Sequence, residues 1–132
     1  MSPNRAAWYK RPVPIEYAIR EGMVQAQASG VLDDASLTSY VERLLADPQY
    51  SPDLPVLFDS TQATVLELSG AGVRDATAVV REWPTHPTAR VALVVSSPAA
   101  YGMARMYGLF RDVEVSVFED RELALAWLTN HA

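Results

Sequence analysis

Apolar residues recur along the chain with two different periods, and the period changes from one segment to the next. Short continuous or alternating apolar stretches are typical of β-strands, whereas apolar residues three and four positions apart are typical of α-helices. The strand pattern occurs at residues 15–19, 23–29, 56–59, 91–95 and 113–118. The helix pattern occurs in segments bounded by residues 34–47, 69–84, 98–110 and 123–128.

Turn and cap residues mark where these segments begin and end. Glu21-Gly22 separates the first two strands, which favours an antiparallel hairpin. Gly30 is predicted to end the second strand, and Asp33 or Asp34 to cap the helix that follows. Asp47-Pro48 ends that helix, since the residue before a proline is driven out of the helical region.

The resulting element order is β-β-α-β-α-β-α-β-α. Such alternation calls for right-handed crossovers and a mainly parallel sheet, with the initial hairpin supplying the antiparallel edge. We therefore predict an α/β fold, a single domain with a mixed, mainly parallel five-stranded sheet and four helices. Residues 1–13 are predicted to be an extended N-terminal tail, and residues 14–132 the domain.

The composition narrows the classes of function. The 132 residues are 49% hydrophobic and 20% charged, which is typical of a folded domain and not of extended disorder. The net charge of -5 disfavours nucleic acid as a partner, because such a surface does not attract phosphates. No apolar run approaches the roughly 20 residues that a membrane span requires, and no signal peptide is evident. A cytoplasmic protein without an integral membrane segment is expected.

The sequence contains few of the residue patterns that enzymes use for catalysis. The chain has no cysteine, which excludes thiol catalysis, disulfides and thiolate metal sites. The two histidines, His86 and His131, show no spacing to a nucleophile or to acidic residues that would indicate a catalytic relay or a metal site. Neither a Gly-x-Ser-x-Gly turn nor a complete dinucleotide fingerprint is present. We therefore expect a protein that is not an enzyme and that holds no cofactor and no metal.

One stretch carries a recognisable layout. An apolar strand runs into Asp59-Ser60-Thr61, and eight residues after Thr61 comes Ser69-Gly70-Ala71-Gly72 at the start of a helix. This layout resembles the signature of STAS domains, the sporulation anti-sigma-factor-antagonist (SpoIIAA-like) family. In that family a strand ends in Asp-x-Ser, and an Asp-Ser-Ser-Gly-x-Gly turn opens the next helix with a phosphorylatable serine. Ser69 stands at the position of that serine.

Other features are similar to the SpoIIAA-like branch found widely in bacteria, whose members mostly lack an established activity. These features are Gly30, Tyr101-Gly102, Arg105-Met106-Tyr107, Val117-Phe118 with Asp120, and Ala126-Trp127-Leu128. The resemblance implies the STAS fold, a protein partner and a regulatory role for Ser69. The branch is also compared with the lipid-binding lobe of SEC14/CRAL-TRIO proteins, which implies a lipid-like ligand instead. The chain departs from the family pattern at Glu67-Leu68, where the sporulation regulators have Asp-Ser.

Two interpretations of the polar residues remain open. Ser69 suits a helix cap, whose loss costs about 1 kcal/mol, and it also suits a phosphorylation site, because a helix N-terminus holds a phosphate well. Loops at the carboxyl ends of parallel strands are the usual ligand edge of an open sheet, so neighbouring polar residues can form a partner- or anion-binding edge. The alternative is that they are turn and cap residues only. The candidate edge residues are Asp59, Ser60, Thr61, Gly70, Ser96 and Ser97.

The third predicted helix is unusually apolar. Its spacing predicts a core stripe of Ala99, Met103, Met106, Tyr107 and Phe110, yet its opposite side, with Ala104, is fairly apolar too. Methionine and aromatic side chains adapt to varied partners or to an acyl chain. The candidate lining residues of an apolar ligand site or an interface are Trp83, Met103, Met106, Tyr107 and Phe110.

Three functions follow from these observations. The leading hypothesis is a non-catalytic, STAS-like regulatory binding module of a bacterium that docks a protein partner, with Ser69 as the candidate switch. The alternative is a carrier or sensor of an apolar, lipid-like small molecule held between the sheet and the helices. A third is a homodimer whose interface is the apolar third helix.

Overall fold

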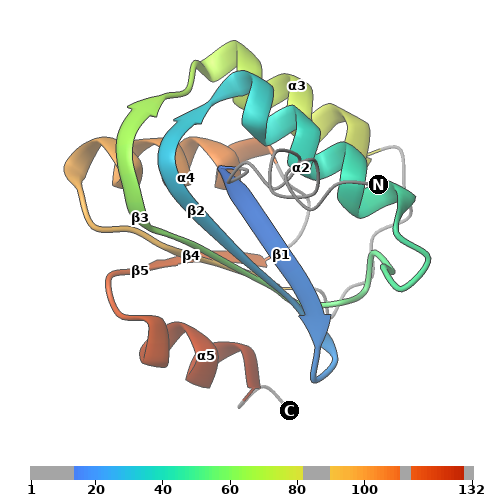
Figure 1. The fold of residues 1–132 in the computed structure, drawn as a ribbon. Helices are drawn as coiled ribbons and strands as arrows, with labels where there is room; N and C mark the ends of the chain where they lie inside the picture. The colour runs from blue at the N-terminus through green and yellow to red at the C-terminus, as the bar shows by residue number, and fades with distance from the viewer. Residues whose placement is uncertain (1–13, 82–89, 111–113, 130–132) are drawn as a thin grey trace, which may run out of the picture.

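The fold follows the predicted order of elements. The computed structural model describes residues 14–81, 90–110 and 114–129, without the side chains of residues 77–81 and 108–110. The predicted tail, residues 1–13, lies outside the described residues. The elements are β1 (Ile15–Arg20), β2 (Met23–Asp33), α2 (Asp34–Ala46), β3 (Val56–Glu67), α3 (Gly70–Arg81), β4 (Arg90–Val94), α4 (Pro98–Phe110), β5 (Glu114–Phe118) and α5 (Arg121–Thr129) (Figure 1).

The five strands form one sheet in the order β1-β2-β3-β4-β5. β1 and β2 are antiparallel, and every later pair is parallel, which confirms the predicted mixed sheet. The hairpin turn consists of Glu21 and Gly22, both at positive φ (56° and 73°), as a two-residue turn that matches the strand twist requires. Only its second residue is a glycine, so Glu21 carries the conformational cost of the turn.

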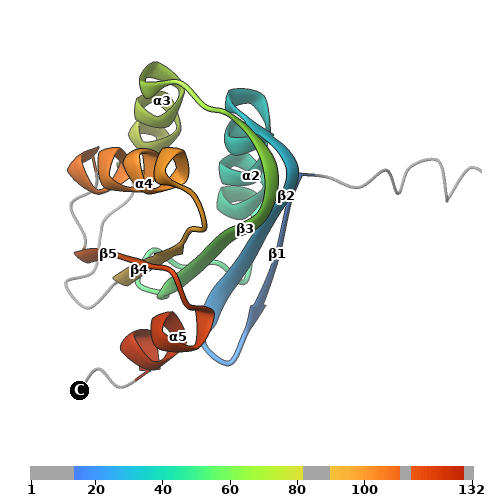
Figure 2. The same ribbon diagram turned by 90° about the vertical axis from the view of Figure 1, so that its left-hand side faces the viewer.

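The helices cover the two faces of the sheet unequally. α2, α3 and α4 lie on one face, and α5 lies alone on the other (Figure 2). Of the three, α3 packs chiefly against α2 and α4 and makes few contacts with the strands (Figure 2). The α5 face buries Leu57, Ala92 and Val94 against Ala124 and Leu128. The opposite face therefore holds most of the core, with α3 forming the outermost wall.

β2 and β3 extend further than the sequence indicated. The predicted ends, residues 29 and 59, are wrong, since pairing continues to Asp33 and Glu67. Gly30 does not end β2; at φ 68° it lies within the strand, where the pairing register shifts before Val31. A glycine reaches this conformation at no steric cost, so the strand bends and continues.

The outer half of β3 has a partner on one side only in the described part of the chain. β4 pairs with residues 56–59 of β3, whereas β2 pairs with residues as far as Glu67. The extended pair β2–β3 therefore forms an arm that curves past the end of β4 toward α2 and α3 (Figure 2). This arm carries the chain from the centre of the sheet to the start of α3.

β1 is tied to the end of α2 by a half-buried tyrosine, Tyr17. The Tyr17 hydroxyl donates a hydrogen bond to Asp47 Oδ2 at 2.8 Å, and the Arg43 guanidinium donates one to the Ile15 carbonyl at 2.7 Å. Burial, and then the bond to Asp47, raise the pKa of Tyr17 to about 12. The Gln49 backbone N–H, and then the Tyr17 hydroxyl, lower the pKa of Asp47.

The tyrosine makes stability depend on alkaline pH. Unfolded Tyr17 loses its proton near pH 10, whereas the folded protein keeps it to about pH 12, so the stability that Tyr17 contributes is complete below pH 10 and declines between these values. Urea unfolding from pH 8 to 12 measures this slope, which Tyr17→Phe is expected to flatten. Tyr101→Phe, at a 42% exposed position, is the control that keeps the slope. An equally steep decline in Tyr17→Phe would contradict the assignment.

Candidate functional site

The turn before α3 presents Ser69 as the helix cap. The Gly72 backbone N–H donates a hydrogen bond to Ser69 Oγ at 2.9 Å, and the Val73 N–H donates to the Ser69 carbonyl at 3.0 Å. These bonds confirm the predicted cap, because they satisfy N–H groups that have no partner within the helix. Ser69 itself is exposed.

A carboxylate from another helix occupies the same turn. Asp34, the first residue of α2, accepts a hydrogen bond from the Ser69 N–H at 2.9 Å and another from the Ser69 hydroxyl at 2.7 Å. The N-terminal end of a helix favours a negative charge, so the position stabilises the carboxylate. The start of α2 and the start of α3 are therefore joined through one serine.

The two glycines of the turn, Gly70 and Gly72, leave room for side chains of α4 and α2 to come close to its backbone. A Cβ on Gly72 would lie 2.1 Å from Asp34 Cγ, and a Cβ on Gly70 would lie 3.1 Å from Met106 Sδ. Any larger residue at position 72 therefore pushes Asp34 away from Ser69. Met106 of α4 thus packs at the turn, as a neighbour of Gly70.

Sequence reasoning missed the role of Asp34. It considered Asp33 and Asp34 as alternative caps of the same helix, and the structure assigns that cap to Asp33, whose Oδ1 accepts the Ser36 N–H at 2.8 Å. The sequence signal for this role was the presence of two adjacent acidic residues at one helix start. A helix cap uses only one of them, which leaves the other available for a different contact. The second carboxylate is thereby free to bond to Ser69.

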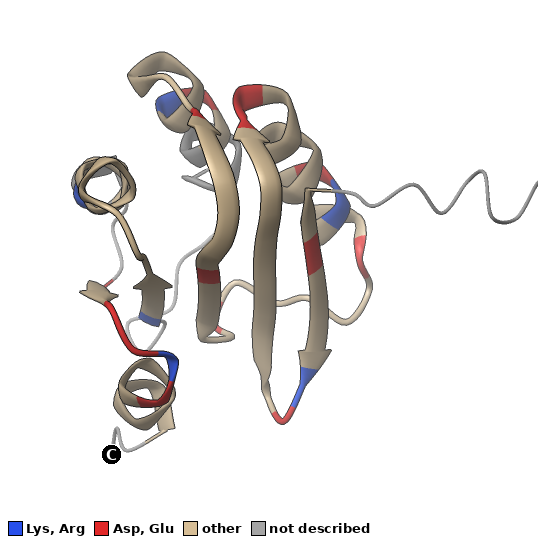
Figure 3. Ribbon diagram, turned by 60° about the vertical axis from the view of Figure 1, so that its left-hand side comes forward, with Lys and Arg blue, Asp and Glu red and all other residues tan. Residues whose placement is uncertain are grey.

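Acidic residues gather around this turn. Asp33 and Glu67 are paired across β2 and β3, directly before α2 and shortly before α3. Figure 3 shows these acidic positions together where the two strands end, beside the starts of both helices. Nearby on the arm, Val31 and Val65 are paired and are 42% and 43% exposed. The end of the arm thus carries carboxylates near the turn and an exposed apolar pair on the face opposite Leu32 and Leu66.

Asp59 and Ser60 lie far from this turn and point to opposite faces of the sheet. Asp59 is 5% exposed and accepts hydrogen bonds from the Thr61 N–H (2.9 Å) and the Thr61 hydroxyl (2.6 Å). Its second oxygen accepts from Arg121 of α5 at 3.1 Å. β3 continues for eight residues after Asp59, as far as Glu67. At about 3.3 Å per residue this length is roughly 26 Å, so the structure does not bring Asp59 together with Ser69.

Ser60 lies on the side of the sheet that faces α2, α3 and α4. Its hydroxyl donates a hydrogen bond to the Val94 carbonyl at 2.9 Å, at the end of β4. Ser96 and Ser97 follow shortly after and are exposed; Ser97 Oγ accepts the Ala100 N–H at 3.1 Å and caps α4. The predicted binding edge is therefore divided among three places, and its role in binding stays a prediction.

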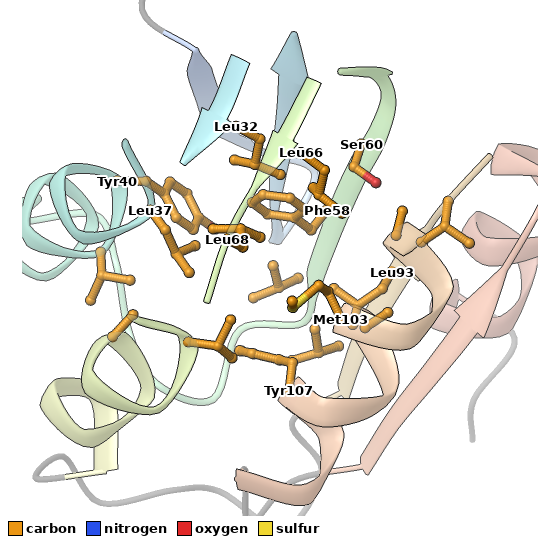
Figure 4. A pocket seen from close by; sticks show the side chains of 18 of the residues that line it. Leu32, Leu37, Tyr40, Phe58, Ser60, Leu66, Leu68, Leu93, Met103 and Tyr107 are labelled. Atoms are coloured by element: carbon orange, nitrogen blue, oxygen red, sulfur yellow. The ribbon is translucent and has the colours of Figure 1, made fainter. Parts of the chain in front are cut away.

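An apolar cavity of about 110 Å³ lies between the sheet and α2, α3 and α4 (Figure 4). Phe58 and Leu66 of β3 contribute to one wall, Tyr40 of α2 to another, and Met103 and Tyr107 of α4 to a third (Figure 4). The cavity is partly open to solvent, and the apolar lining that stays in contact with water costs about 25 cal/mol per Å². Filling it with apolar atoms would offset that cost.

The cavity accounts for part of the predicted apolar site. Met103 and Tyr107 line it, whereas Met106 packs at Gly70 instead. Trp83 lies outside the described residues, as does the side chain of Phe110. Of the predicted core stripe of α4, Met103 and Tyr107 are confirmed as inward residues, whereas Ala99 is wrong: it is exposed, and Ala100 and Ala104 face inward. The apolar character of both sides of this helix had left its rotation ambiguous.

Leu68, which stands where the sporulation regulators have a serine, has a structural role of its own. It replaces a small polar residue directly before the capping serine, and its side chain lines the cavity. An apolar residue here extends the core beneath α3, while Ser69 next to it stays exposed. The change thus serves packing and leaves the capping turn intact.

Two further observations concern the residues that the structure describes. None of their helices is long and apolar enough to cross a membrane. No group of three or more acidic or histidine side chains among them is arranged to hold a metal ion.

Comparison with known proteins identifies the fold. No family model matches the sequence, and no curated protein does. The structure is similar to that of an uncharacterised DUF3478-family protein with a SpoIIAA-like fold from Shewanella loihica, with 24% identity, a TM-score of 0.59, and coverage of 86% of this chain and 93% of the other. It is also similar to an anti-sigma factor antagonist from Mycobacterium paratuberculosis, with 18% identity, a TM-score of 0.60, and coverage of 89% and 97%. The chain has the SpoIIAA-like fold.

Proposed function

We propose that this protein is a non-catalytic regulatory module that docks a protein partner at the turn before α3, and that modification of Ser69 controls the docking. The observation that carries the proposal is the exposed Ser69 hydroxyl, held by a carboxylate of a different helix at 2.7 Å. An anti-sigma factor antagonist of the same fold lends it support, since that name implies a protein partner. The third hypothesis from the sequence, a homodimer through α4, has no comparable observation in its favour among the described residues.

A phosphate on Ser69 would act through Asp34. It carries nearly two negative charges and would compete with the Asp34 carboxylate for the same helix terminus. Asp33 and Glu67 are close by, so the new charge enters a surface that is already acidic (Figure 3). Displacement of Asp34 would break its two hydrogen bonds to Ser69, which join the starts of α2 and α3, and change the shape of the turn.

The surface beside the turn suits a partner in the unmodified state. Val31 and Val65 supply exposed apolar area on the same arm, on the face opposite Leu32 and Leu66, and a partner that reaches from the turn over the end of the arm gains stability by covering them. A phosphate on the turn would have to lose water when such a partner binds, and this cost disfavours docking. Unmodified protein is therefore the binding form, and phosphorylated protein the released form.

Affinity capture from the native host tests the proposal. Wild-type protein and Ser69→Ala are expected to retain the same partner, and Ser69→Asp to lose it. Val65→Ser is expected to weaken capture without changing Ser69. Intact mass spectrometry of the protein from its host is expected to show a phosphorylated fraction that Ser69→Ala lacks. If Ser69 is never modified and Ser69→Asp retains every captured partner, the proposal is wrong.

A further inference from the structure

The apolar cavity is the feature of the molecule that the docking proposal leaves unused. It lies between the sheet and α2, α3 and α4 and is partly open to solvent, and its walls are apolar except for hydroxyl groups (Figure 4). Protein interiors contain few voids larger than a water molecule. A space of about 110 Å³ beneath a helix that scarcely touches the sheet is therefore a candidate binding site.

Water is a poor occupant of this space. A buried water needs two to four polar partners, and apolar cavities of comparable size stay dry and take small apolar molecules such as benzene. The Ser60 hydroxyl lines the cavity, and its hydrogen is already donated to the Val94 carbonyl. With so few polar groups among mostly apolar side chains, the space suits a cluster of waters poorly, and apolar atoms fit it better.

The volume also limits the size of the occupant. A cavity of roughly 150 Å³ accepts a single benzene ring, so about 110 Å³ corresponds to a molecule of at most one small ring. A long acyl chain is several times larger. The lipid-like ligand that the sequence suggested is thus too large to be covered by this cavity unless the helices move apart.

Ser60 determines which chemical group the occupant carries. Because its hydrogen is bonded to Val94, the Ser60 oxygen has lone pairs left to accept a hydrogen bond but no proton to donate. A phenol or alcohol hydroxyl can donate to it, whereas a carboxylate finds no donor there. We propose that this cavity binds a small, one-ring apolar molecule that donates one hydrogen bond to Ser60.

The binding test uses three probes on the full chain: phenol, toluene and dodecanoate. Amide resonances in protein NMR spectra report the binding of each as it is titrated. Phenol is expected to bind most tightly and to shift resonances around Ser60, Val94 and Met103, with toluene about five- to tenfold weaker because it has no donor. Absence of phenol binding at millimolar concentration, or tighter binding of dodecanoate than of phenol, would overturn the proposal.

Variants assign the binding to this cavity. Ser60→Ala is expected to remove the preference for phenol and leave the affinity for toluene unchanged. Ala100→Leu places a larger side chain in the cavity and is expected to abolish binding of both rings, whereas Ala99→Leu, at the neighbouring exposed position of α4, is the matched control. Circular dichroism checks that each variant is folded. Equal binding by Ala100→Leu and Ala99→Leu would place the ligand elsewhere and refute the proposal. This result would not bear on the docking proposal, because neither variant changes Ser69.

Discussion

Asp59→Ala is expected to lower the free energy of unfolding by about 2–3 kcal/mol. The carboxylate is 5% exposed and accepts bonds from the Thr61 N–H, the Thr61 hydroxyl and Arg121. Removal leaves a partly buried N–H without its partner, and each hydrogen bond to a charged group contributes about 1.5–3 kcal/mol. Arg121 limits the loss, because its side chain is 42% exposed and regains water. Urea unfolding measures the change.

The same variant separates a structural role of Asp59 from a role in binding. Glu16→Ala, on an exposed position of β1, removes the same charge and is expected to change stability by less than about 0.5 kcal/mol. Captured partners are expected to bind Asp59→Ala as they bind the wild type, once the fraction of folded protein is matched. A stable Asp59→Ala that loses the partner would assign Asp59 to the docking surface instead.

Ser69→Asp is expected to destabilise the protein by about 1–2 kcal/mol, although aspartate is as good a helix cap as serine. The cost comes from Asp34, whose two hydrogen bonds to Ser69 at 2.9 and 2.7 Å give way to repulsion between two carboxylates. In an Asp34→Ala background the same substitution is expected to be neutral, or to stabilise through the helix dipole. The double-mutant cycle over Ser69 and Asp34 measures this coupling, expected at about 1.5 kcal/mol.

Ser97→Asp is the matched control for this cycle. Ser97 caps α4 through the Ala100 N–H, and the first turn of that helix carries no acidic residue. The substitution is expected to be neutral or stabilising, and the penalty at Ser69 to shrink at 1 M salt, where the screening length falls to about 3 Å. If Ser97→Asp and Ser69→Asp are equally destabilising, the effect is general to helix caps and Asp34 has no special role.

Much of the fold could be predicted because its signals are local. The helix from Asp34 to Ala46 repeats apolar residues at helical spacing and begins with a carboxylate cap. Residues 91–95, which include most of β4, are a continuous apolar run buried on both faces. Residues 60–67 of β3 were harder, since Asp59-Ser60-Thr61 resembles a turn. Their β-branched residues Thr61, Thr64 and Val65 were the strand signal that the turn pattern obscured.

The candidate site was predictable only in part. Ser69 and its glycines could be identified as a helix start, because a cap and the residues it serves are within four positions of each other. The contact with Asp34 spans 35 positions and depends on how two helices lie beside each other. Asp59 and Ser60 are adjacent in sequence but face opposite sides of a strand, which separates them once the strand is known to continue.

The sequence by itself determined the element order, the mixed sheet and the capped start of α3, since periodicity, caps and turns act over a few residues. Only the tertiary structure decided that Asp34 occupies that helix terminus, that Asp59 is bonded to Arg121, and that a cavity remains beneath α3. These features arise where elements distant in the chain meet. Their geometry depends on packing between several elements at once, which no local pattern records.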